Sequence, residues 1–325
     1  MTIRRELRGE IEPEGGSLLL IMKSKILSWN VREINDVNKC LRIRSLLRSW
    51  KIDIVCLQET KLRGIDRNII RRLWGCSFVG WCYLASSWAS GGVLVMWDKR
   101  VVEMVEDCTG SYSMAVIFRN IEDGWRWAFA GVYGPNVNSD RSSLWEELAG
   151  LYSLWDLPWI FCGDFNIVRY PSERAGASTV TGAMEDFSEL IFYLNLVDLP
   201  LVGRDYTWSN NRGWSRLDRF LVSSSWESHF PDLCQKRLPR VCSDHFPILL
   251  DCGGIHGGRH PFKFENMWLE VEGFVEKVRA WWEAYSFEGT PIFIVAGKLK
   301  ALKANVKKWN EEVFRHRSVE KYSLG

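Results

Sequence analysis

The stretch IFCGDFNIV, residues 160–168, decides the fold prediction because it ends a run of bulky apolar residues with two polar side chains. Asp164 and Asn166 follow that run and stand two positions apart. The run has the length and composition of a buried β-strand. Successive residues of a strand point to opposite faces, so residues two apart share a face. We therefore expect a buried strand that presents a carboxylate and an amide together at its end.

Similar apolar patterns elsewhere predict further strands, with amphipathic helices between some of them. The predicted strands cover residues 25–31, 53–59, 91–97, 113–119, 125–133, 158–166, 216–223 and 246–252. The predicted helices cover residues 37–50, a segment that follows Asn138 and Ser139, and residues 183–195. Strand runs mixed with short helices indicate an α/β sandwich. The chain lacks strict βαβ alternation, which argues against a doubly wound parallel sheet.

The two ends of the chain differ in character from the segment between them. Residues 1–21 show no periodicity and predict a disordered leader. Residues 22–253 contain all the predicted strands and form the predicted domain. Residues 254–325 begin with a Gly-rich stretch and continue with Trp and Lys at helical spacing. This last segment therefore predicts a linker followed by a basic helical extension.

The overall composition is globular and bears on several classes of protein. The net charge of +2, from 42 Lys and Arg against 40 Asp and Glu, favours neither nucleic acid nor any other charged partner. The apolar run at 18–22 is too short for a signal peptide or a membrane span, so we expect no membrane association. Nine cysteines without a C-x-x-C pair indicate a reduced, intracellular protein. Cys252, His256 and His260 have a zinc-like spacing but no fourth ligand nearby.

Polar side chains recur where the predicted strands end or begin. They are Asn30, Glu59, Tyr133, Asp164, Asn166, Asp218, Asp244 and His245. One polar strand end is typical of any surface turn, whereas this set indicates carboxylates, amides and one imidazole converging on one rim of a sheet. Such hard oxygen donors suit Mg²⁺ or Mn²⁺ together with a phosphate group, while zinc would require more His or Cys.

Six segments of the chain carry a family resemblance. They read SWNVREIND (28–36), LQET (57–60), VYGPN (132–136), GDFN (163–166), RLDRFLVS (216–223) and SDHFPI (243–248). In order and spacing they resemble the endonuclease/exonuclease/phosphatase family, over about residues 22–253. The resemblance implies the DNase I-like fold, a four-layer α/β sandwich of two mixed β-sheets flanked by helices, here with a C-terminal helical extension.

Within that family, the amino-acid sequences of several segments are most similar to those of the endonuclease of plant LINE-type non-LTR retroelements. These segments are SWNVR, LQETK, VYGP and GGVLVMWD, the last at residues 91–98. The tail from PFKFENMW onward resembles the connector that leads, in those polyproteins, into a reverse transcriptase. No reverse transcriptase follows within the 325 residues.

The resemblance implies a metal site and a base. Glu59 is implied as the main ligand of Mg²⁺ or Mn²⁺, with Asn30 beside it. Asp164 and Asp244 belong to the same implied metal set. Asp164 is also implied to orient or deprotonate the attacking water, and Asp244 to support the metal or the histidine.

The remaining motif residues are implied to act on the phosphate. Asn166 and Asn136 are implied to hold a phosphate oxygen, so that the spacing of two in GDFN delivers a base and a phosphate clamp to one site. Tyr133 is implied to approach the phosphate or the leaving oxygen. His245 is implied as the phosphate-stabilising imidazole, with Asp218 fixing its orientation.

Basic residues near the first motif are candidates for contact with the DNA backbone. They are Arg32, Arg42, Arg44 and Arg48. A solvated helix face is the alternative for the three in the predicted helix. Trp208 and Trp214 precede RLD, where family members contact substrate, but packing is the role we favour for them.

Two residues depart from the family pattern. Arg32 stands where many repair-type members have an acidic residue, which removes one metal ligand and points to the retroelement subfamily. Glu33 replaces a glycine that is usual in this motif. If the turn requires a positive φ, Glu33 adds strain of roughly 1 kcal/mol, and a decaying copy is then an alternative reading.

The sequence therefore predicts a Mg²⁺- or Mn²⁺-dependent DNA endonuclease that nicks phosphodiester bonds. The alternatives are another enzyme of the same fold (a repair nuclease, an inositol-phosphate phosphatase or a deadenylase) and a catalytically impaired fragment that only binds nucleic acid. We expect DNA as partner, with no obligate protein partner and no membrane. Only the family's substrate points to the nucleus.

Overall fold

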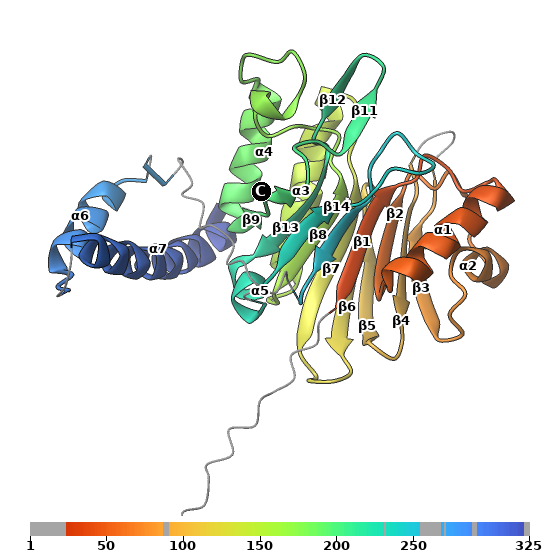
Figure 1. Ribbon diagram of the computed structural model, residues 1–325, viewed down its shortest axis with the longest axis horizontal. Coiled ribbons are helices and arrows are strands. Elements are labelled where there is room, and N and C mark those ends of the chain that lie inside the picture. Colours follow the sequence, from red (N-terminus) through yellow and green to blue (C-terminus); the bar gives the residue numbers. More distant parts are fainter. Residues whose placement is uncertain are drawn as a thin grey trace, which may run out of the picture.

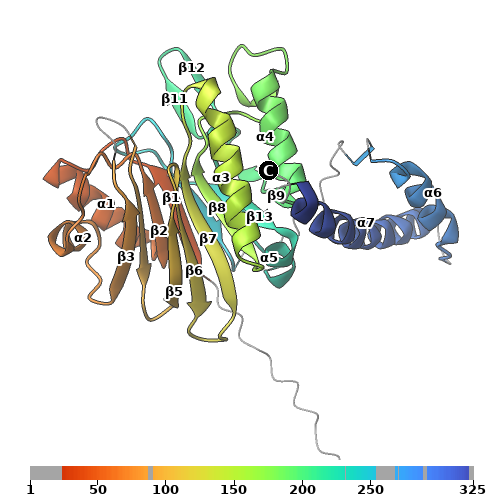
Figure 2. The ribbon, with the colours of Figure 1, turned by 180° about the vertical axis from the view of Figure 1, so that it is seen from behind.

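Two β-sheets pack face to face at the centre of the protein, and helices cover their outer faces (Figure 1). The computed structural model describes residues 24–86, 91–230, 232–253, 268–269, 271–287 and 291–321. Helices α1 (Val37–Trp50) and α2 (Arg67–Leu73) lie on the outer side of one sheet. Helices α3 (Arg141–Leu154) and α4 (Gly182–Tyr193) lie on the outer side of the other, as the view from behind shows (Figure 2).

The first sheet is mixed and has seven strands in the order β10-β14-β15-β1-β2-β4-β3. Their bounds are Leu201–Val202 (β10), Cys234–Arg237 (β14), Ile248–Asp251 (β15), Lys25–Asn30 (β1), Ile54–Gln58 (β2), Val93–Asp98 (β4) and Val79–Leu84 (β3). β1 runs parallel to β2 and antiparallel to β15. Because β1 and β2 are parallel, their polar ends lie at the same rim of the sheet.

The second sheet is also mixed and has six strands in the order β5-β6-β7-β8-β13-β9. Their bounds are Val102–Thr109 (β5), Ser113–Asn120 (β6), Arg126–Tyr133 (β7), Trp159–Asp164 (β8), Asp218–Ser223 (β13) and Leu196–Asp198 (β9). β8 runs parallel to β7 and antiparallel to β13. A separate hairpin is formed by β11 (Trp208–Asn210) and β12 (Gly213–Ser215), and α5 (Ser224–His229) follows β13.

Alternation along the central strands assigns their side chains to two different layers of the core. Ile26, Cys56, Cys162 and Phe220 belong to the cluster between the two sheets. Their neighbours in sequence, such as Leu27, belong to the clusters under the helices. The same period of two turns Asn30, Tyr133 and Asp164, the last residues of β1, β7 and β8, toward the space between the sheets. The inter-sheet core therefore ends, at one rim, in polar groups.

The predicted α/β sandwich of two mixed sheets with flanking helices is confirmed. The helix predicted at 37–50 has those bounds, and each predicted strand corresponds to an observed one. The prediction missed β3, β5, β9, β10, β11, β12 and β14, as well as α2 and α5. Most of these strands are short or lie at a sheet edge. β5 is largely exposed, so its sequence shows no apolar alternation.

The helical extension predicted after residue 253 contains α6 (Phe274–Ala284) and α7 (Pro291–Lys321). Trp268, Phe274, Val306 and Trp309 form a small apolar cluster that packs against Phe192 of α4. Lys307 Nζ lies 2.8 Å from Glu227 Oε2 of α5, which ties α7 to the sandwich. The expected leader at 1–21 and the Gly-rich linker at 254–267 lie outside the described residues. Of the helices described, none is long and apolar enough to cross a membrane.

The turn between β1 and α1 has the backbone conformation that makes Glu33 unfavourable. The φ angles of Arg32 and Glu33 are 57° and 151°. Residues with a Cβ rarely adopt the conformation of Glu33, whereas glycine does so readily. The turn nevertheless keeps Asn30 in place, because Asn30 Oδ1 accepts a hydrogen bond of 3.0 Å from the Arg32 backbone N–H. The strain at Glu33 is thus local to the turn.

We expect Glu33→Gly to raise the free energy of unfolding by about 1 kcal/mol, because relief of the strained φ outweighs the chain entropy that glycine adds to the unfolded state. Urea denaturation of the two proteins measures this difference. Glu33→Ala is the matched control, since it removes the same charge but keeps the Cβ. Equal stabilities of the Gly and Ala variants would contradict the assignment of strain to this residue.

Candidate active site

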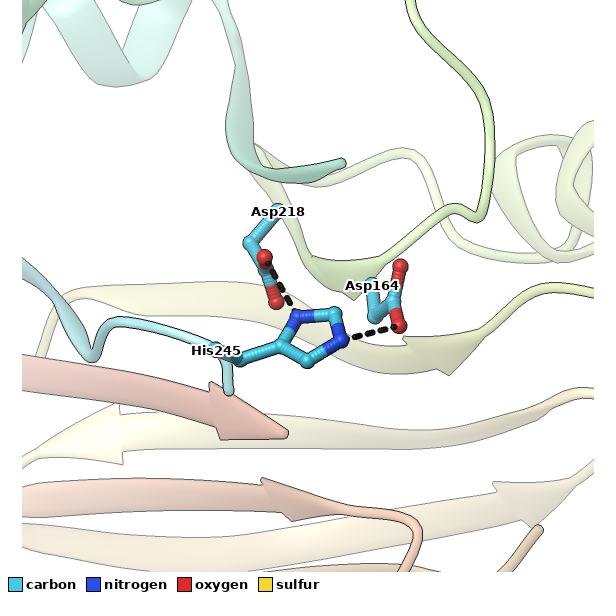
Figure 3. A group of neighbouring side chains, drawn as sticks. All are labelled: Asp164, Asp218 and His245. Carbon is cyan, nitrogen blue, oxygen red and sulfur yellow. Dashed lines mark hydrogen bonds and ion pairs between the residues drawn. The ribbon is translucent and has the colours of Figure 1, made fainter. Parts of the chain in front are cut away.

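A cleft of about 750 Å³ opens at the rim where the inter-sheet core ends. Most of the residues predicted for the site line it, namely Asn30, Arg32, Glu59, Tyr133, Asn136, Asp164, Asn166, Asp244 and His245. Asp218 lies beside the His245 ring, on its Nδ1 side (Figure 3). Arg42, Arg44 and Arg48 do not line the cleft and lie on the exposed face of α1. We call this hollow the catalytic cleft.

Strand register brings the acidic residues together. Asp164 at the end of β8 is opposite Asp218 in β13 and opposite Tyr133 in β7. Gly163 allows this close approach, since its φ is 147° and a Cβ there would lie 1.9 Å from Val132 O. From the other sheet, Asn30 Nδ2 donates a hydrogen bond of 2.8 Å to Asp164 Oδ2. The rim therefore gathers residues from four strands.

His245 lies between the two buried carboxylates, as Figure 3 shows. Its Nδ1 is 2.9 Å from Asp218 Oδ2, and its Nε2 is 3.7 Å from Asp164 Oδ2. The backbone of His245 is also fixed. Its N–H donates to Ser243 Oγ at 3.1 Å, and its carbonyl accepts from Trp29 Nε1 at 3.2 Å. The predicted pairing of His245 with Asp218 is present in the structure, and the ring has one orientation.

Burial and neighbouring charges shift the pKa values of both His245 and Asp164. Burial alone would lower the pKa of His245, but Asp218 and Asp164 outweigh it and raise that pKa to about 9. Burial raises the pKa of Asp164 to about 6, with His245 opposing and Asp218 adding to the rise. Near neutral pH the imidazole is therefore protonated and Asp164 is largely ionised. Burial and the charges of Glu59 and Asp164 raise the pKa of Tyr133 above its usual range.

The expectation that Asp164 and Asn166 share a strand face is wrong. β8 ends at Asp164, and Asn166 has a left-handed backbone with a φ of 52°. Asp164 Oδ1 accepts a hydrogen bond of 2.9 Å from the Asn166 backbone N–H, which turns the chain out of the strand. Asn166 Nδ2 then donates to Gly134 O at 2.7 Å. Asn166 still lines the cleft, but a turn capped by Asp164, rather than strand alternation, brings it there.

Asp244 joins two separate segments at the mouth of the cleft. Its Oδ2 accepts hydrogen bonds from Arg32 Nη1 at 2.7 Å and from Trp208 Nε1 at 2.8 Å. Its Oδ1 is buried and has no hydrogen-bond partner among the described residues. Trp208, for which we favoured packing, thus anchors an acidic residue of the site. The indole donor is visible in the sequence, but its acceptor is 36 residues away.

The cleft is also lined by two arginines that lie outside the motifs, Arg141 and Arg174. The Arg141 side chain is buried, and its Nη2 donates to Asn166 O at 2.8 Å. Arg141 therefore supports the turn that carries Asn166. Its signal in the sequence was only its place at the start of a predicted helix, which does not indicate a site residue.

The oxygen atoms around Asn30 fit a hard divalent cation. Asn30, Glu59, Asp164 and Asp244 supply amide and carboxylate oxygens to one cleft, and the unpartnered Asp244 Oδ1 is a buried acceptor without a donor. The described part of the chain also contains a tighter group, Asp164, Asp218 and His245, whose ligand atoms lie within 4.8 Å of one another. An imidazole between two carboxylates is protonated and has no lone pair for a metal. The oxygen set therefore fits a divalent cation better than this group does.

Comparison with known proteins identifies the class of this protein. The sequence profile of the endonuclease/exonuclease/phosphatase family matches residues 27–245, and the chain belongs to that family. Members of the family are divalent-metal-dependent hydrolases of phosphodiesters and phosphate esters. The predicted DNase I-like sandwich is confirmed with it.

The chain is similar to several individual proteins of known name. It is 25% identical over 259 residues to an exodeoxyribonuclease of Bacillus subtilis. The alignment covers 70% of this chain and 98% of that protein. The structure resembles an AP endonuclease from Archaeoglobus fulgidus with a TM-score of 0.55 and 20% identity, over 70% of this chain and 98% of that one. It also resembles the endonuclease domain of TRAS1, a telomere-specific non-LTR retrotransposon, with a TM-score of 0.56 and 14% identity, over 71% and 98%. At this identity the two structures show a shared fold.

We expect the imidazole of His245 to titrate near its raised pKa of about 9 in the folded protein, and Asp218→Asn to lower that pKa toward the ordinary value of about 6.5. The substitution removes the carboxylate that contributes most to the raised pKa of His245, while burial of the ring continues to lower that pKa. NMR titration of the histidine ring signals in EDTA measures the shift. Asp123→Asn, beside His229, is the control and should leave His245 unchanged. An unaltered pKa of His245 in Asp218→Asn would contradict the coupling.

Proposed function

We propose that this protein is a Mg²⁺- or Mn²⁺-dependent DNA endonuclease of the retroelement type, which nicks one strand and leaves 3′-hydroxyl and 5′-phosphate ends. The observation that carries the proposal is the cluster at the rim, in which Asn30 joins Asp164 across the sheets beside a charged His245. The sequences of the motifs that contain Asn30, Glu59 and Tyr133 support the assignment to the retroelement type.

In the proposed reaction, Asp164 acts on the attacking water. Its pKa of about 6 leaves it ionised at neutral pH yet basic enough to accept a proton. The hydrogen bonds from Asn30 Nδ2 and the Asn166 backbone N–H hold the carboxylate in one orientation. A water hydrogen-bonded to Asp164 is thereby aligned for attack on the phosphorus atom.

On the phosphate, charge builds up on the non-bridging oxygens as the water attacks. The protonated His245 donates to one of these oxygens, and the Asn136 amide is a second donor at the same cleft. Asp218 keeps the imidazolium charged and oriented. Tyr133, which stays protonated because its pKa is raised, lies beside Asp164 and is the proposed donor to the leaving oxygen.

A bound divalent cation would be held by Asn30, Glu59, Asp164 and Asp244, and it would neutralise the developing negative charge on the phosphate. The oxygen donors of this set favour Mg²⁺ or Mn²⁺ over zinc. Residues 22–253 form the proposed catalytic domain, with residues 254–325 as an appended linker and helical extension.

A second candidate is an abasic-site or exonucleolytic repair nuclease of the same family. The observation that favours it is the similarity to the Bacillus subtilis exodeoxyribonuclease over 98% of that protein. Duplexes with and without one abasic site distinguish the two functions. Faster cleavage at the abasic site by a large factor would favour the repair enzyme.

We expect the full chain to convert supercoiled plasmid into the nicked form in the presence of Mg²⁺, and EDTA to stop the reaction. Glu59→Ala should abolish nicking, because it removes the main carboxylate ligand of the proposed cation. Gel separation of supercoiled and nicked plasmid measures both results. Lys99→Ala is the control and should nick like the parent, because Lys99 follows β4 at the end of the first sheet away from the cleft. Absence of nicking by folded protein, or nicking that survives Glu59→Ala, would exclude the proposal.

Asp218→Ala should lower the turnover rate by roughly 10²–10⁴-fold, because the imidazole loses its charge partner and its fixed orientation. DNA affinity should change far less, since backbone contacts dominate it. The rate of the variant should also decline at a lower pH than that of the parent as pH rises, because His245 then loses its proton earlier. Single-turnover rates across pH test this. If Asp218→Ala kept the turnover rate of the parent while Asp164→Ala lost all activity, the proposed role of the His245–Asp218 pair would be refuted.

A further inference from the structure

A second cleft, of about 1120 Å³, opens beside the catalytic cleft. Arg32, Asn210 and Asp244 line both hollows, so the two adjoin at these residues. The second cleft lies between the turn that follows β1, the start of α1, the tip of the β11–β12 hairpin and residues 240–244. We call it the basic cleft, because five cationic side chains line it, namely Arg32, Lys39, Lys61, Arg212 and Arg240.

The charge of the basic cleft is not balanced locally. Against its five cations it contains two carboxylates, Glu33 and Asp244. Arg32 is paired with Asp244 at 2.7 Å, and Lys61 lies 3.4 Å from Glu59. Among the described residues, no hydrogen bond or ion pair engages the Lys39 ammonium or the Arg212 guanidinium. These two cations face the same hollow from α1 and from the hairpin.

The uncharged lining residues indicate what kind of anion would fit. Ser209, Asn210, Asn211 and Ser243 supply hydroxyl and amide groups. Asn210 Oδ1 already accepts from the Arg212 and Gly213 backbone N–H groups, at 2.8 and 3.0 Å, which fixes the hairpin tip. The described residues that line the cleft include no aromatic side chain. Phosphate contacts need cations and small polar donors, whereas single-stranded bases need aromatic surfaces on which to stack.

The structure also separates Lys39 from the arginines of the same helix. Lys39 lies in the first turn of α1, next to the basic cleft. The Arg44 guanidinium lies against Gly75, where a Cβ would be 2.6 Å from Arg44 Nη2, on the side of α2. Arg48 lies in the last turn of α1. Lys39 is therefore the basic residue of α1 that lines the basic cleft.

We propose that the basic cleft binds the sugar-phosphate backbone of duplex DNA to one side of the cleaved phosphodiester, through Lys39 and Arg212 and without reading the bases. This inference rests on the proposed function, because the strand that enters the catalytic cleft continues past Arg32 into the basic cleft. Glu33 opposes this binding through its negative charge at the edge of the cleft. The retroelement-type Arg32 joins the two clefts, where an acidic residue would repel the same backbone.

The test is the salt dependence of binding to a fluorescein-labelled DNA duplex in EDTA, where cleavage does not interfere. Each lost phosphate contact lowers the slope of log K against log salt by about 0.9. The double variant Lys39→Ala/Arg212→Ala should therefore lower the slope by about 1.8 and weaken binding equally for duplexes of unrelated sequence. Glu33→Gln should tighten binding.

The matched control is Lys99→Ala/Arg126→Ala, which also removes one lysine and one arginine. Both control residues are exposed, and the strand register places them at the ends of β4 and β7 that lie away from the clefts. The control should keep the slope of the parent. An unchanged slope in Lys39→Ala/Arg212→Ala, with binding by the parent intact, overturns the basic cleft alone. No salt-dependent binding by the parent overturns the proposed function together with it.

Discussion

The hydrogen bond from Asn30 Nδ2 to Asp164 Oδ2 joins the two sheets at the point where the protein can do chemistry. Each partner is the last residue of a central strand, and each continues the row of side chains that faces the other sheet. The apolar part of this inter-sheet row holds the sandwich together by burial. At its polar end the same packing holds an amide and a carboxylate 2.8 Å apart, without solvent between them. Stability and site geometry therefore depend on one interface.

The strand that carries Asp218 shows how the rest of the site is braced. Alternation turns Asp218 toward His245 and Arg219 toward the other side of the sheet. Arg219 Nη1 pairs with Asp198 at 2.8 Å and Arg216 Nη2 with the same carboxylate at 2.9 Å, and both arginines also contact Glu173. These groups are buried, so loss of one partner would leave an uncompensated charge at a cost of roughly 3–5 kcal/mol. The network fixes the strand on which the histidine depends.

The hairpin of β11 and β12 connects this braced core to the two clefts. Trp208 pairs with His245 in an isolated β-bridge, and its indole binds Asp244. Arg240 donates from the neighbouring segment to Ser209 O at 2.9 Å. A hairpin held at its base in this way presents its polar tip at a defined distance from the catalytic residues. The catalytic and basic clefts share their wall through the Arg32–Asp244 pair, so one acidic residue organises both.

The sequence by itself determined the class of fold and most residues of the site. Apolar alternation located the central strands, and the motifs around Asn30, Glu59, Asp164, Asp218 and His245 named the polar groups at their ends. This succeeded because buried strands impose a period of two that any reader of the chain can see. The edge strand β5 escaped prediction because most of its residues are exposed, and exposure removes that constraint. The residues of β3 are all buried or half-buried, so its apolar run lacks the alternation that marks a strand.

Only the tertiary structure decided how those groups are arranged. Asn166 enters the cleft through a turn that Asp164 caps, a contact that spacing along a strand did not predict. Trp208 and Arg141 belong to the site through partners 36 and 25 residues away. Lys39 rather than Arg44 lines the basic cleft, because the Arg44 guanidinium lies against Gly75 instead. Local sequence specifies which face of an element is apolar, but the partner of a polar side chain is set by whichever distant segment packs against it.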